Sequence, residues 1–222
     1  MYLENKKNVP LPSKVKEALI GELLGDGCIR FTKKITDGQP KLNTNALYCM
    51  TLKKKDHIDY LWGNVFSSIC SNIPPRPWPN PKTGKTPSQY NFNTKSLPAL
   101  TDLHKKWYKW DKDLNKFIKI VPLDIKDDLT AIGLAHWIMG DGFWSQNSVF
   151  LCTDGFTIEE VDLLIETLAI NFNLIASKRR RIQANGGICW RIRFSSKQEN
   201  ITKLINLVEN YFIPSLLYKL GK

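Results

Sequence analysis

One segment of this chain occurs twice, and the duplication constrains the fold more than any other feature. The segment Leu19–Gly27 recurs as Leu134–Gly142, and each copy is an apolar stretch with helical spacing that ends in Gly-Asp-Gly. Asp26 and Asp141 lie about half of the 222-residue chain apart. A chain built from two similar halves can pair its matching helices, so we expect a pseudo-twofold axis to bring these two carboxylates together.

Both aspartates stand where an acid is disfavoured. The C-terminal end of a helix carries partial negative charge, and an acid there costs about 0.3–1 kcal/mol. A local rule broken at two equivalent positions indicates a functional site. Asp37-Gly38 and Asp154-Gly155 lack a preceding apolar helix and a matching partner, so we interpret them as ordinary turns.

The charge balance favours a polyanionic partner. Lys and Arg number 32 against 21 Asp and Glu, which gives a net charge of +11, and nucleic acid is the leading candidate. No apolar run is long enough for a membrane span, and the first residues lack a signal-peptide core, so we expect no membrane association. The five cysteines form no C-x-x-C pair, which argues against disulfides and structural zinc and favours a reducing, intracellular compartment.

The duplication extends beyond the Gly-Asp-Gly segments. Asn91–Lys95 resembles Arg193–Lys197, and the spacing between matching segments shrinks along the chain. An insertion must therefore lie early in the first half, and polar Lys33–Asn45 supplies it as a longer hairpin tip. The pattern predicts an α+β fold of two pseudo-symmetric αββαββα halves, at residues 1–112 and 113–222.

Local patterns predict the elements of each half. In the first half we expect helices over 13–25, 55–70 and 97–109, and strands near 28–34, 45–53 and 88–94. In the second half we expect helices over 128–140, 157–172 and 197–211, and strands near 143–152, 175–183 and 187–195. Thr157 should cap the middle helix, and Asn185-Gly186 should form a hairpin turn.

Alternation along the strands predicts two sheet faces of different chemistry. Trp190, Ile192 and Phe194 share one face, which should meet the helices. The opposite face carries side chains whose forked groups match base edges in the major groove, and a basic run nearby is suited to phosphates. The predicted nucleic-acid surface comprises Arg30, Thr32, Lys34, Gln89, Asn91, Asn93, Lys178, Arg179, Arg180, Arg181, Gln183, Arg191, Arg193 and Ser195.

Small residues predict that the two repeated helices pack side by side. Gly21 and Gly25 are four residues apart, as are His136 and Gly140, and this spacing lets backbones approach closely. Two neighbouring carboxylates repel unless a cation lies between them. Hard oxygen ligands suit Mg²⁺, which can activate water and neutralise charge on a scissile phosphate. We therefore expect the motif aspartates to share a Mg²⁺ site.

At these residues the chain resembles the LAGLIDADG homing endonucleases. The match runs through both repeated segments and, with the internal repeat, covers nearly the whole chain. It looks closest to the single-chain group that includes the yeast mitochondrial omega-intron endonuclease, because of Leu134–Gly142, Phe156–Val161 and Tyr218–Leu220. The resemblance implies a monomer with the two motif helices at its centre and two saddle-shaped antiparallel sheets in the major groove of double-stranded DNA.

The resemblance also implies an activity. Family members hydrolyse both DNA strands across the minor groove with a divalent metal and leave 3′ overhangs. Lys119 and Lys219 would lie near the scissile phosphates, where a lysine can polarise water or stabilise the transition state. The implied cofactor is Mg²⁺, with Mn²⁺ able to substitute and Ca²⁺ supporting binding without cleavage. The implied metal ligands are the motif aspartates and the carbonyls before them: Asp26, Asp141, Gly25 and Gly140.

The motifs depart from the family pattern at three positions. Glu22 replaces an apolar residue in the first copy, and His136 and Trp137 replace small and apolar residues in the second. A histidine at a close-packing position should widen or tilt the helix contact.

Other functions of the same scaffold stay open. They are an RNA maturase that binds a group I intron, and a DNA-binding protein that has lost cleavage. The presence of both aspartates favours cleavage and leaves room for a dual function. Encoding by an organelle intron would place the protein in a mitochondrion or plastid.

Overall fold

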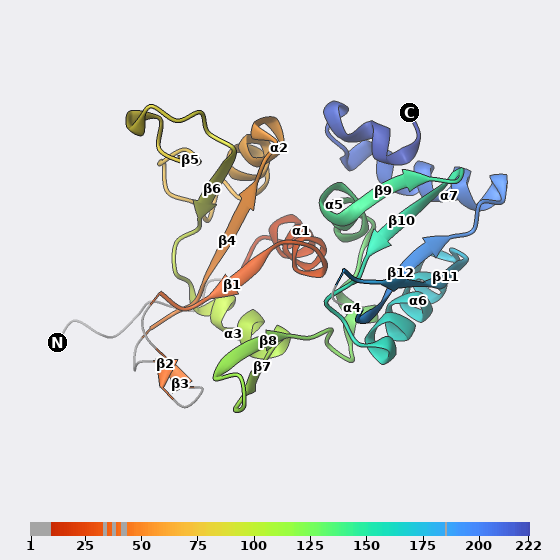
Figure 1. Ribbon diagram of the computed structural model, residues 1–222, viewed down its shortest axis with the longest axis horizontal. Coiled ribbons are helices and arrows are strands. Elements are labelled where there is room, and N and C mark those ends of the chain that lie inside the picture. Colours follow the sequence, from red (N-terminus) through yellow and green to blue (C-terminus); the bar gives the residue numbers. More distant parts are fainter. Residues whose placement is uncertain (1–9, 33–34, 37–38, 41–43, 185) are drawn as a thin grey trace. The chain divides into compact units, whose positions relative to one another are not determined.

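The computed structural model contains the same order of elements twice, and it describes residues 10–32, 35–36, 39–40, 44–184 and 186–222. The first half contains α1 (Ser13–Leu24), β1 (Cys28–Arg30), β4 (Leu47–Leu52), α2 (Lys55–Tyr60), β5 (Arg76–Trp78), β6 (Gln89–Asn93) and α3 (Pro98–Trp107). The second half contains α5 (Ala131–Asp141), β9 (Gly142–Ser145), β10 (Ser148–Cys152), α6 (Ile158–Phe172), β11 (Ala176–Ile182), β12 (Ile188–Phe194) and α7 (Gln198–Val208). The predicted αββαββα order is confirmed for both halves (Figure 1).

Each half builds one four-stranded antiparallel sheet with the same topology. The first sheet has the order β1-β4-β6-β5, and the second has the order β9-β10-β12-β11. The middle strands are β4 and β6 in the first sheet and β10 and β12 in the second. The edge strands are β1 and β5 in the first sheet and β9 and β11 in the second. An identical strand order is what duplication of one unit requires, so the topology supports the internal repeat.

Hairpins and short helices are added to this repeat. Strands β2 (Ile35–Thr36) and β3 (Gln39–Pro40) pair antiparallel within the predicted insertion, as a longer hairpin requires. Lys34 and the Asp37-Gly38 turn lie outside the described residues. A second hairpin, β7 (Tyr108–Asp111) with β8 (Lys116–Lys119), follows α3 and leads to α4 (Ile125–Asp128). This second hairpin and α4 have no counterpart among the predicted elements.

The helix expected over 55–70 is shorter than the prediction. Regular α2 passes into a π-helical turn at Leu61–Val65, and the following residues form turns. Gly63, Asn64 and Val65 are weak helix formers, which explains why the regular helix stops here. By contrast, Thr157 caps α6 as expected: its side chain accepts from the Glu160 backbone, and the Glu160 carboxylate accepts from the Thr157 backbone.

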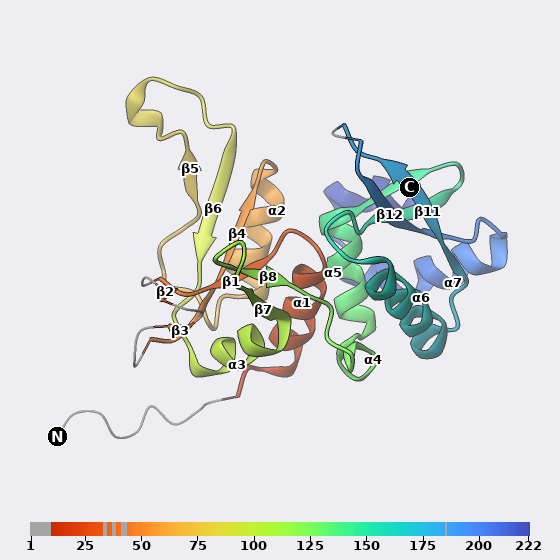
Figure 2. The same ribbon diagram turned by 60° about the horizontal axis from the view of Figure 1, so that its bottom comes forward.

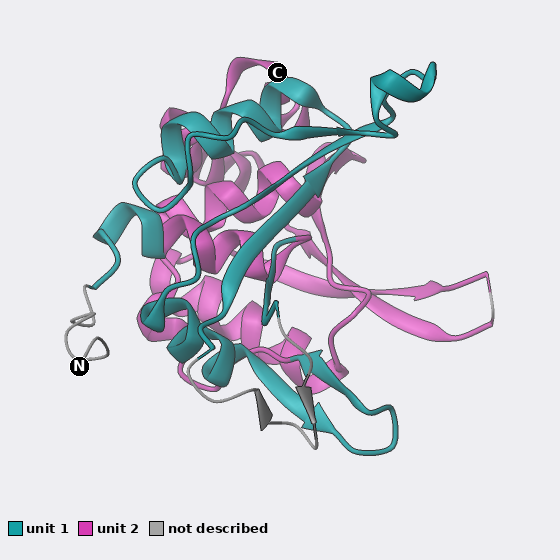
Figure 3. Ribbon diagram, turned by 90° about the vertical axis from the view of Figure 1, so that its left-hand side faces the viewer, with its two compact units in different colours: residues 1–16, 27–119 teal, residues 17–26, 120–222 magenta. Residues whose placement is uncertain are grey.

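The chain divides into two compact units, coloured separately in Figure 3. One unit comprises residues 1–16 and 27–119, and the other comprises residues 17–26 and 120–222. The C-terminal part of α1 therefore belongs to the same unit as α5. The predicted boundary at 112/113 falls inside the β7–β8 hairpin. Among the described residues, no helix has both the length and the apolar character that crossing a membrane requires.

Each sheet buries one face against helices. In the second unit, Leu151, Ile192 and Phe194 are fully buried, and α6 lies along this side of β11 and β12 (Figure 2). In the first unit, Ile29 and Phe92 are buried in the same way. The alternation therefore predicted correctly which strand residues meet the helices, and it leaves the other face of each sheet for polar side chains.

Candidate functional site

The C-terminal part of α1 and the whole of α5 belong to one unit, and their backbones approach closely. A Cβ atom added at Gly21 would lie 2.0 Å from the carbonyl oxygen of Gly133, and one added at Gly133 would lie 3.1 Å from the carbonyl oxygen of Glu17. The helices therefore meet through Gly21 and Gly133, where a side chain would push them apart. The expectation that Gly140 is a close-packing position is wrong, because nothing lies within 4 Å of its Cβ position.

The two polar residues that depart from the motif pattern pair with each other. His136 Nδ1 lies 2.8 Å from Glu22 Oε1, and the two side chains are 4% and 1% exposed. The expectation that a histidine here would widen or tilt the helix contact stays a prediction, and the structure shows how the side chain is accommodated. His136 Cβ lies 2.8 Å from the Cβ position of Gly21, so the glycine provides the space and Glu22 provides the polar partner.

This close contact brings the two motif ends together. Asp141 is the last residue of α5, and its carboxyl carbon lies 3.4 Å from the Cβ position of Gly25. Its two carboxylate oxygens lie 3.5 and 3.7 Å from the same position. Gly25 directly precedes Asp26, which is exposed, while Asp141 is half-buried. Two acids about half the chain apart in sequence thus stand at neighbouring helix ends.

Lys219 binds the end of α5. Its Nζ donates hydrogen bonds of 2.7 Å to the carbonyl oxygens of Met139 and Gly140, and the residue is 9% exposed. The ammonium therefore offsets the partial negative charge of the helix end. One of the two carbonyls that it binds belongs to Gly140, the residue before Asp141. Pro214–Leu220, a 3₁₀-helical segment, carries this lysine to the site.

Lys119 binds Gly27, the last residue of the first motif, within one unit. Its Nζ donates a hydrogen bond of 2.8 Å to the carbonyl oxygen of Gly27, the residue after Asp26. Lys219 contacts the residue before its aspartate, whereas Lys119 contacts the residue after. Both predicted lysines thus lie at motif ends, and the two halves differ in this detail.

The donor set at the helix ends fits a hard divalent cation. Asp26 and Asp141 offer carboxylate oxygens, and the neighbouring backbone offers carbonyl oxygens, which are the donors that Mg²⁺ prefers. Over the described part of the chain, no cluster of three or more His, Cys, Asp or Glu side chains could hold a metal by itself. A site with two carboxylates suits a cation that is shared with phosphate oxygens and water.

The polar face of the second sheet carries arginines beside aromatic rings. Arg191 lies opposite Arg179 and Arg193 opposite Ser177, so these side chains share one face. The Arg191 and Arg193 guanidinium carbons each lie 5.5 Å from a ring centroid, of Phe143 and Phe150 respectively. Ser195 and Gln183 follow β12 and β11 and are half-buried.

The basic run at 178–181 is divided between the two faces of the sheet. Arg179 and Arg181 share the polar face with Arg191, whereas Lys178 and Arg180 project to the face that meets the helices. Lys178 Nζ lies 2.6 Å from Asp162 Oδ2 of α6. The run therefore does not form one continuous phosphate-binding cluster.

Asp154 has a larger role than the turn that its sequence context predicts. Nε and Nη2 of Arg191 donate hydrogen bonds of 3.0 Å to its two carboxylate oxygens, and Arg181 also donates to this carboxylate. Cys189 Sγ lies 3.4 Å from Oδ1. The hydrogen bond from Arg191 holds the pKa of Asp154 below its usual value. Sequence patterns missed Asp154 because the pairing register alone brings these residues together.

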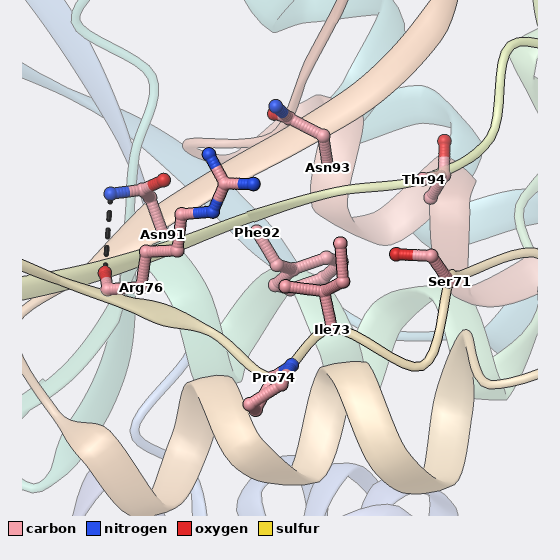
Figure 4. Close-up of a pocket in the computed structure, with 8 residues that line it drawn as sticks. All are labelled: Ser71, Ile73, Pro74, Arg76, Asn91, Phe92, Asn93 and Thr94. Carbon is pink, nitrogen blue, oxygen red and sulfur yellow. Dashed lines mark hydrogen bonds between the residues drawn. The ribbon is translucent and has the colours of Figure 1, made fainter.

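The first sheet presents a polar face with a small pocket. Arg30, Thr32 and Asn93 are exposed, and Gln89 is half-buried. Asn91 Nδ2 donates a 3.2 Å hydrogen bond to the carbonyl oxygen of Arg76, and the two residues are opposite each other on β6 and β5. Figure 4 shows a pocket of about 180 Å³, lined by Ser71, Ile73, Pro74, Arg76, Asn91, Phe92, Asn93 and Thr94.

Arg76 therefore joins the predicted polar set of the first sheet. Its guanidinium projects on the same side of β6 as the side chains of Asn91 and Asn93 (Figure 4). Sequence reasoning missed it because the prolines of Pro74–Pro77 indicate only a helix breaker, whereas Arg76 begins an edge strand.

Comparison with known proteins identifies the relatives of this chain. Residues 16–204 match the model of the LAGLIDADG DNA endonuclease family. Probable intron-encoded endonuclease 1 of Wickerhamomyces canadensis is 30% identical, over 97% of this chain and 87% of that protein. Cytochrome b mRNA maturase bI2 of Debaryomyces hansenii is 26% identical, over 96% of this chain and 76% of that protein.

Two further matches show how much of a relative's length this chain covers and which solved structure has a similar fold. Cytochrome b mRNA maturase bI2 of Saccharomyces cerevisiae is 26% identical over the whole chain, which spans only 52% of that protein. The homing endonuclease I-WcaI, solved bound to its DNA recognition sequence, matches with a TM-score of 0.76 and 28% identity. That match covers 96% of this chain and 88% of the solved chain.

Proposed function

Since the chain belongs to the LAGLIDADG DNA endonuclease family, we propose that it is a site-specific homing endonuclease that acts as a monomer on double-stranded DNA. It makes a double-strand break with 3′ overhangs in a long, asymmetric target. The observation that carries this proposal is the meeting of the two motif ends, where the Asp141 carboxylate lies beside Gly25 and Lys219 binds the same helix end. Two motifs in one chain provide one acid for each DNA strand.

The proposed cleavage depends on a divalent cation. Asp26 and Asp141, with the carbonyl of Gly25, would hold Mg²⁺ together with phosphate oxygens of the DNA. The carbonyl of Gly140, the fourth expected ligand, accepts a hydrogen bond from Lys219 and would have to give it up to bind the cation. When bound, the cation supplies Lewis-acid activation of water and neutralises charge on the scissile phosphate. We expect Mn²⁺ to substitute and Ca²⁺ to support binding without cleavage.

The two lysines contribute fixed positive charge. Backbone carbonyls at 2.7–2.8 Å hold both ammonium groups in place, so their charge is preorganised before DNA binds. A preorganised cation near a phosphate stabilises the charge that develops in the transition state and costs no reorganisation. Lys119 and Lys219 therefore act in catalysis more than in affinity.

The polar sheet faces provide the proposed DNA contacts. Guanidinium groups match guanine edges in the major groove, and the amides of Asn and Gln match adenine. The net charge of +11 adds attraction to phosphates, which predicts binding that weakens steeply as salt concentration rises. The similarity to I-WcaI, a homing endonuclease solved bound to its DNA recognition sequence, supports the same mode of binding.

A second candidate function is that of a group I intron RNA maturase. The observation that favours it is the similarity to two proteins named cytochrome b mRNA maturase. Other relatives are named intron-encoded endonucleases, so an organelle intron is the proposed source of the chain and that organelle its proposed location. Intact aspartates at both motif ends favour DNA cleavage as the main activity.

The decisive experiment is selection of cleaved sites from a random DNA library with Mg²⁺, with Ca²⁺ as the binding-only condition. Asp26→Asn and Asp141→Asn should each abolish double-strand cleavage and leave DNA binding in Ca²⁺ largely intact. Full cleavage by either variant would refute the assignment of the carboxylates. A wild-type protein that binds a DNA site but never cleaves it, and that accelerates splicing of an intron transcript, would establish the maturase function instead.

A further inference from the structure

An acid lies among the arginines on the polar face of the second sheet. Asp154 follows β10, and its side chain is 27% exposed. It binds two of the four arginines that share the polar face, which are Arg179, Arg181, Arg191 and Arg193. A carboxylate on a surface that approaches a polyanion opposes phosphate binding. Its presence there therefore indicates a purpose other than affinity.

The contacts of Asp154 fix the orientation of its partners. Arg191 uses two adjacent nitrogens, Nε and Nη2, in a fork-to-fork pair with both carboxylate oxygens, each at 3.0 Å. The same guanidinium lies over the Phe143 ring, which restrains its plane. Arg181 binds the same carboxylate from the neighbouring strand. One acid thus holds two arginines in a defined geometry.

The pairing also changes what these arginines can recognise. The carboxylate cancels one of the two positive charges of Arg181 and Arg191, so the attraction of this group to any phosphate is reduced. A paired guanidinium still presents N–H donors on the edge that faces away from the carboxylate, and donors read base edges by geometry more than by charge. An oriented arginine whose charge is partly offset by a carboxylate therefore favours sequence-dependent contacts over sequence-independent ones.

We propose that Asp154 is a specificity-determining positioning residue that fixes Arg181 and Arg191 for base contacts and cancels part of their attraction for phosphates. The inference rests on the DNA binding proposed above. It goes beyond that function because it assigns a role in target discrimination to an acid that lies outside the proposed cleavage site.

The test compares two affinities of the Asp154→Asn variant in Ca²⁺, for the selected target duplex and for a scrambled duplex of the same composition. The variant should bind the scrambled duplex more tightly than wild type, because it removes one negative charge beside two arginines. Its preference for the target should fall roughly tenfold, the loss expected for one bidentate base contact. The log–log salt slope should steepen by about one phosphate contact.

A matched control is available in the same basic run. Asp162→Asn breaks the ion pair with Lys178, which projects to the opposite face of the sheet, so it should leave the ratio of target to scrambled affinity unchanged. An unchanged ratio in Asp154→Asn, or an equal loss of affinity for both duplexes, would overturn the inference. A wild-type protein that does not discriminate the two duplexes would instead refute the proposed function.

A second measurement holds even if Asp154→Asn folds poorly. Site selection with Arg191→Gln and with Arg181→Gln shows which target positions each arginine specifies. Asp154→Ser should relax base preference at those same positions. Relaxation at other positions, or none, would contradict the positioning role.

Discussion

The buried pair between Glu22 and His136 offers the sharpest test of the helix interface. Both side chains are almost fully excluded from solvent, and their polar atoms lie 2.8 Å apart across the contact between the motif helices. A double-mutant cycle isolates this contact. It comprises Glu22→Leu, His136→Leu and the variant with both substitutions, because leucine is apolar and similar in volume to either residue.

The structure sets the expected magnitudes. His136→Leu leaves a carboxylate that is 1% exposed without its histidine partner, which should cost about 3–5 kcal/mol of unfolding free energy. Glu22→Leu leaves a buried imidazole without its acid and should cost about 1–3 kcal/mol. Replacing both residues removes both desolvation penalties, so the double variant should lie within about 1–2 kcal/mol of wild type.

Urea unfolding followed by circular dichroism measures these free energies, with the slope m compared among the four proteins to check that the same transition is observed. The coupling energy is the difference between the effect of the double substitution and the sum of the two single effects. We expect it to be at least about 2 kcal/mol, because each single variant leaves one buried polar group unpaired and the double variant leaves none. Additive effects, with a coupling below about 0.5 kcal/mol, would refute the claim that the two departures from the motif compensate each other.

Three more predictions concern other parts of the site and the core. Gly21→Ala should destabilise the protein by roughly 1–3 kcal/mol in urea unfolding, whereas Gly140→Ala should be neutral or stabilising, because only the first Cβ would strike backbone. Lys219→Met should slow DNA cleavage at least tenfold and change the dissociation constant in Ca²⁺ little; the opposite order would make Lys219 a phosphate clamp. Burial lowers the pKa of His104 from 6.5 to about 4. Between these pH values the histidine is protonated in the unfolded chain and neutral in the folded chain. Stability should therefore fall by roughly 3 kcal/mol from neutral pH to pH 4, and His104→Phe should remove this dependence in urea titrations at several pH values.

The roles of the predicted site residues follow from the family and stay predictions until such variants are measured. The structure adds their surroundings. Lys219 binds the carbonyl before Asp141, Lys119 binds the carbonyl after Asp26, and the basic run at 178–181 is divided between two sheet faces. The division follows from strand alternation, because successive side chains of one strand point to opposite faces.

Local signals predicted most elements because their causes are local. The capping box at Thr157 and Glu160 spans three residues, and the alternation of Ile192 and Phe194 repeats every two. The β7–β8 hairpin was missed because its own local signals are weak. Its strands are short, and its turn depends on Asn115 with a positive φ of 48°, which no strong dipeptide signal indicates.

The sequence by itself determined the duplication, the order of elements in each half, the buried face of each sheet and the two acids worth examining. Periodicity and repetition carry that information without any long-range contact. Only the tertiary structure decided that Gly133 and not Gly140 meets the first motif helix, that Glu22 pairs with His136, and that Asp154 holds two arginines. Each of these depends on the relative register of two elements, and helical or strand periodicity defines a face of one element but not the partner that it meets.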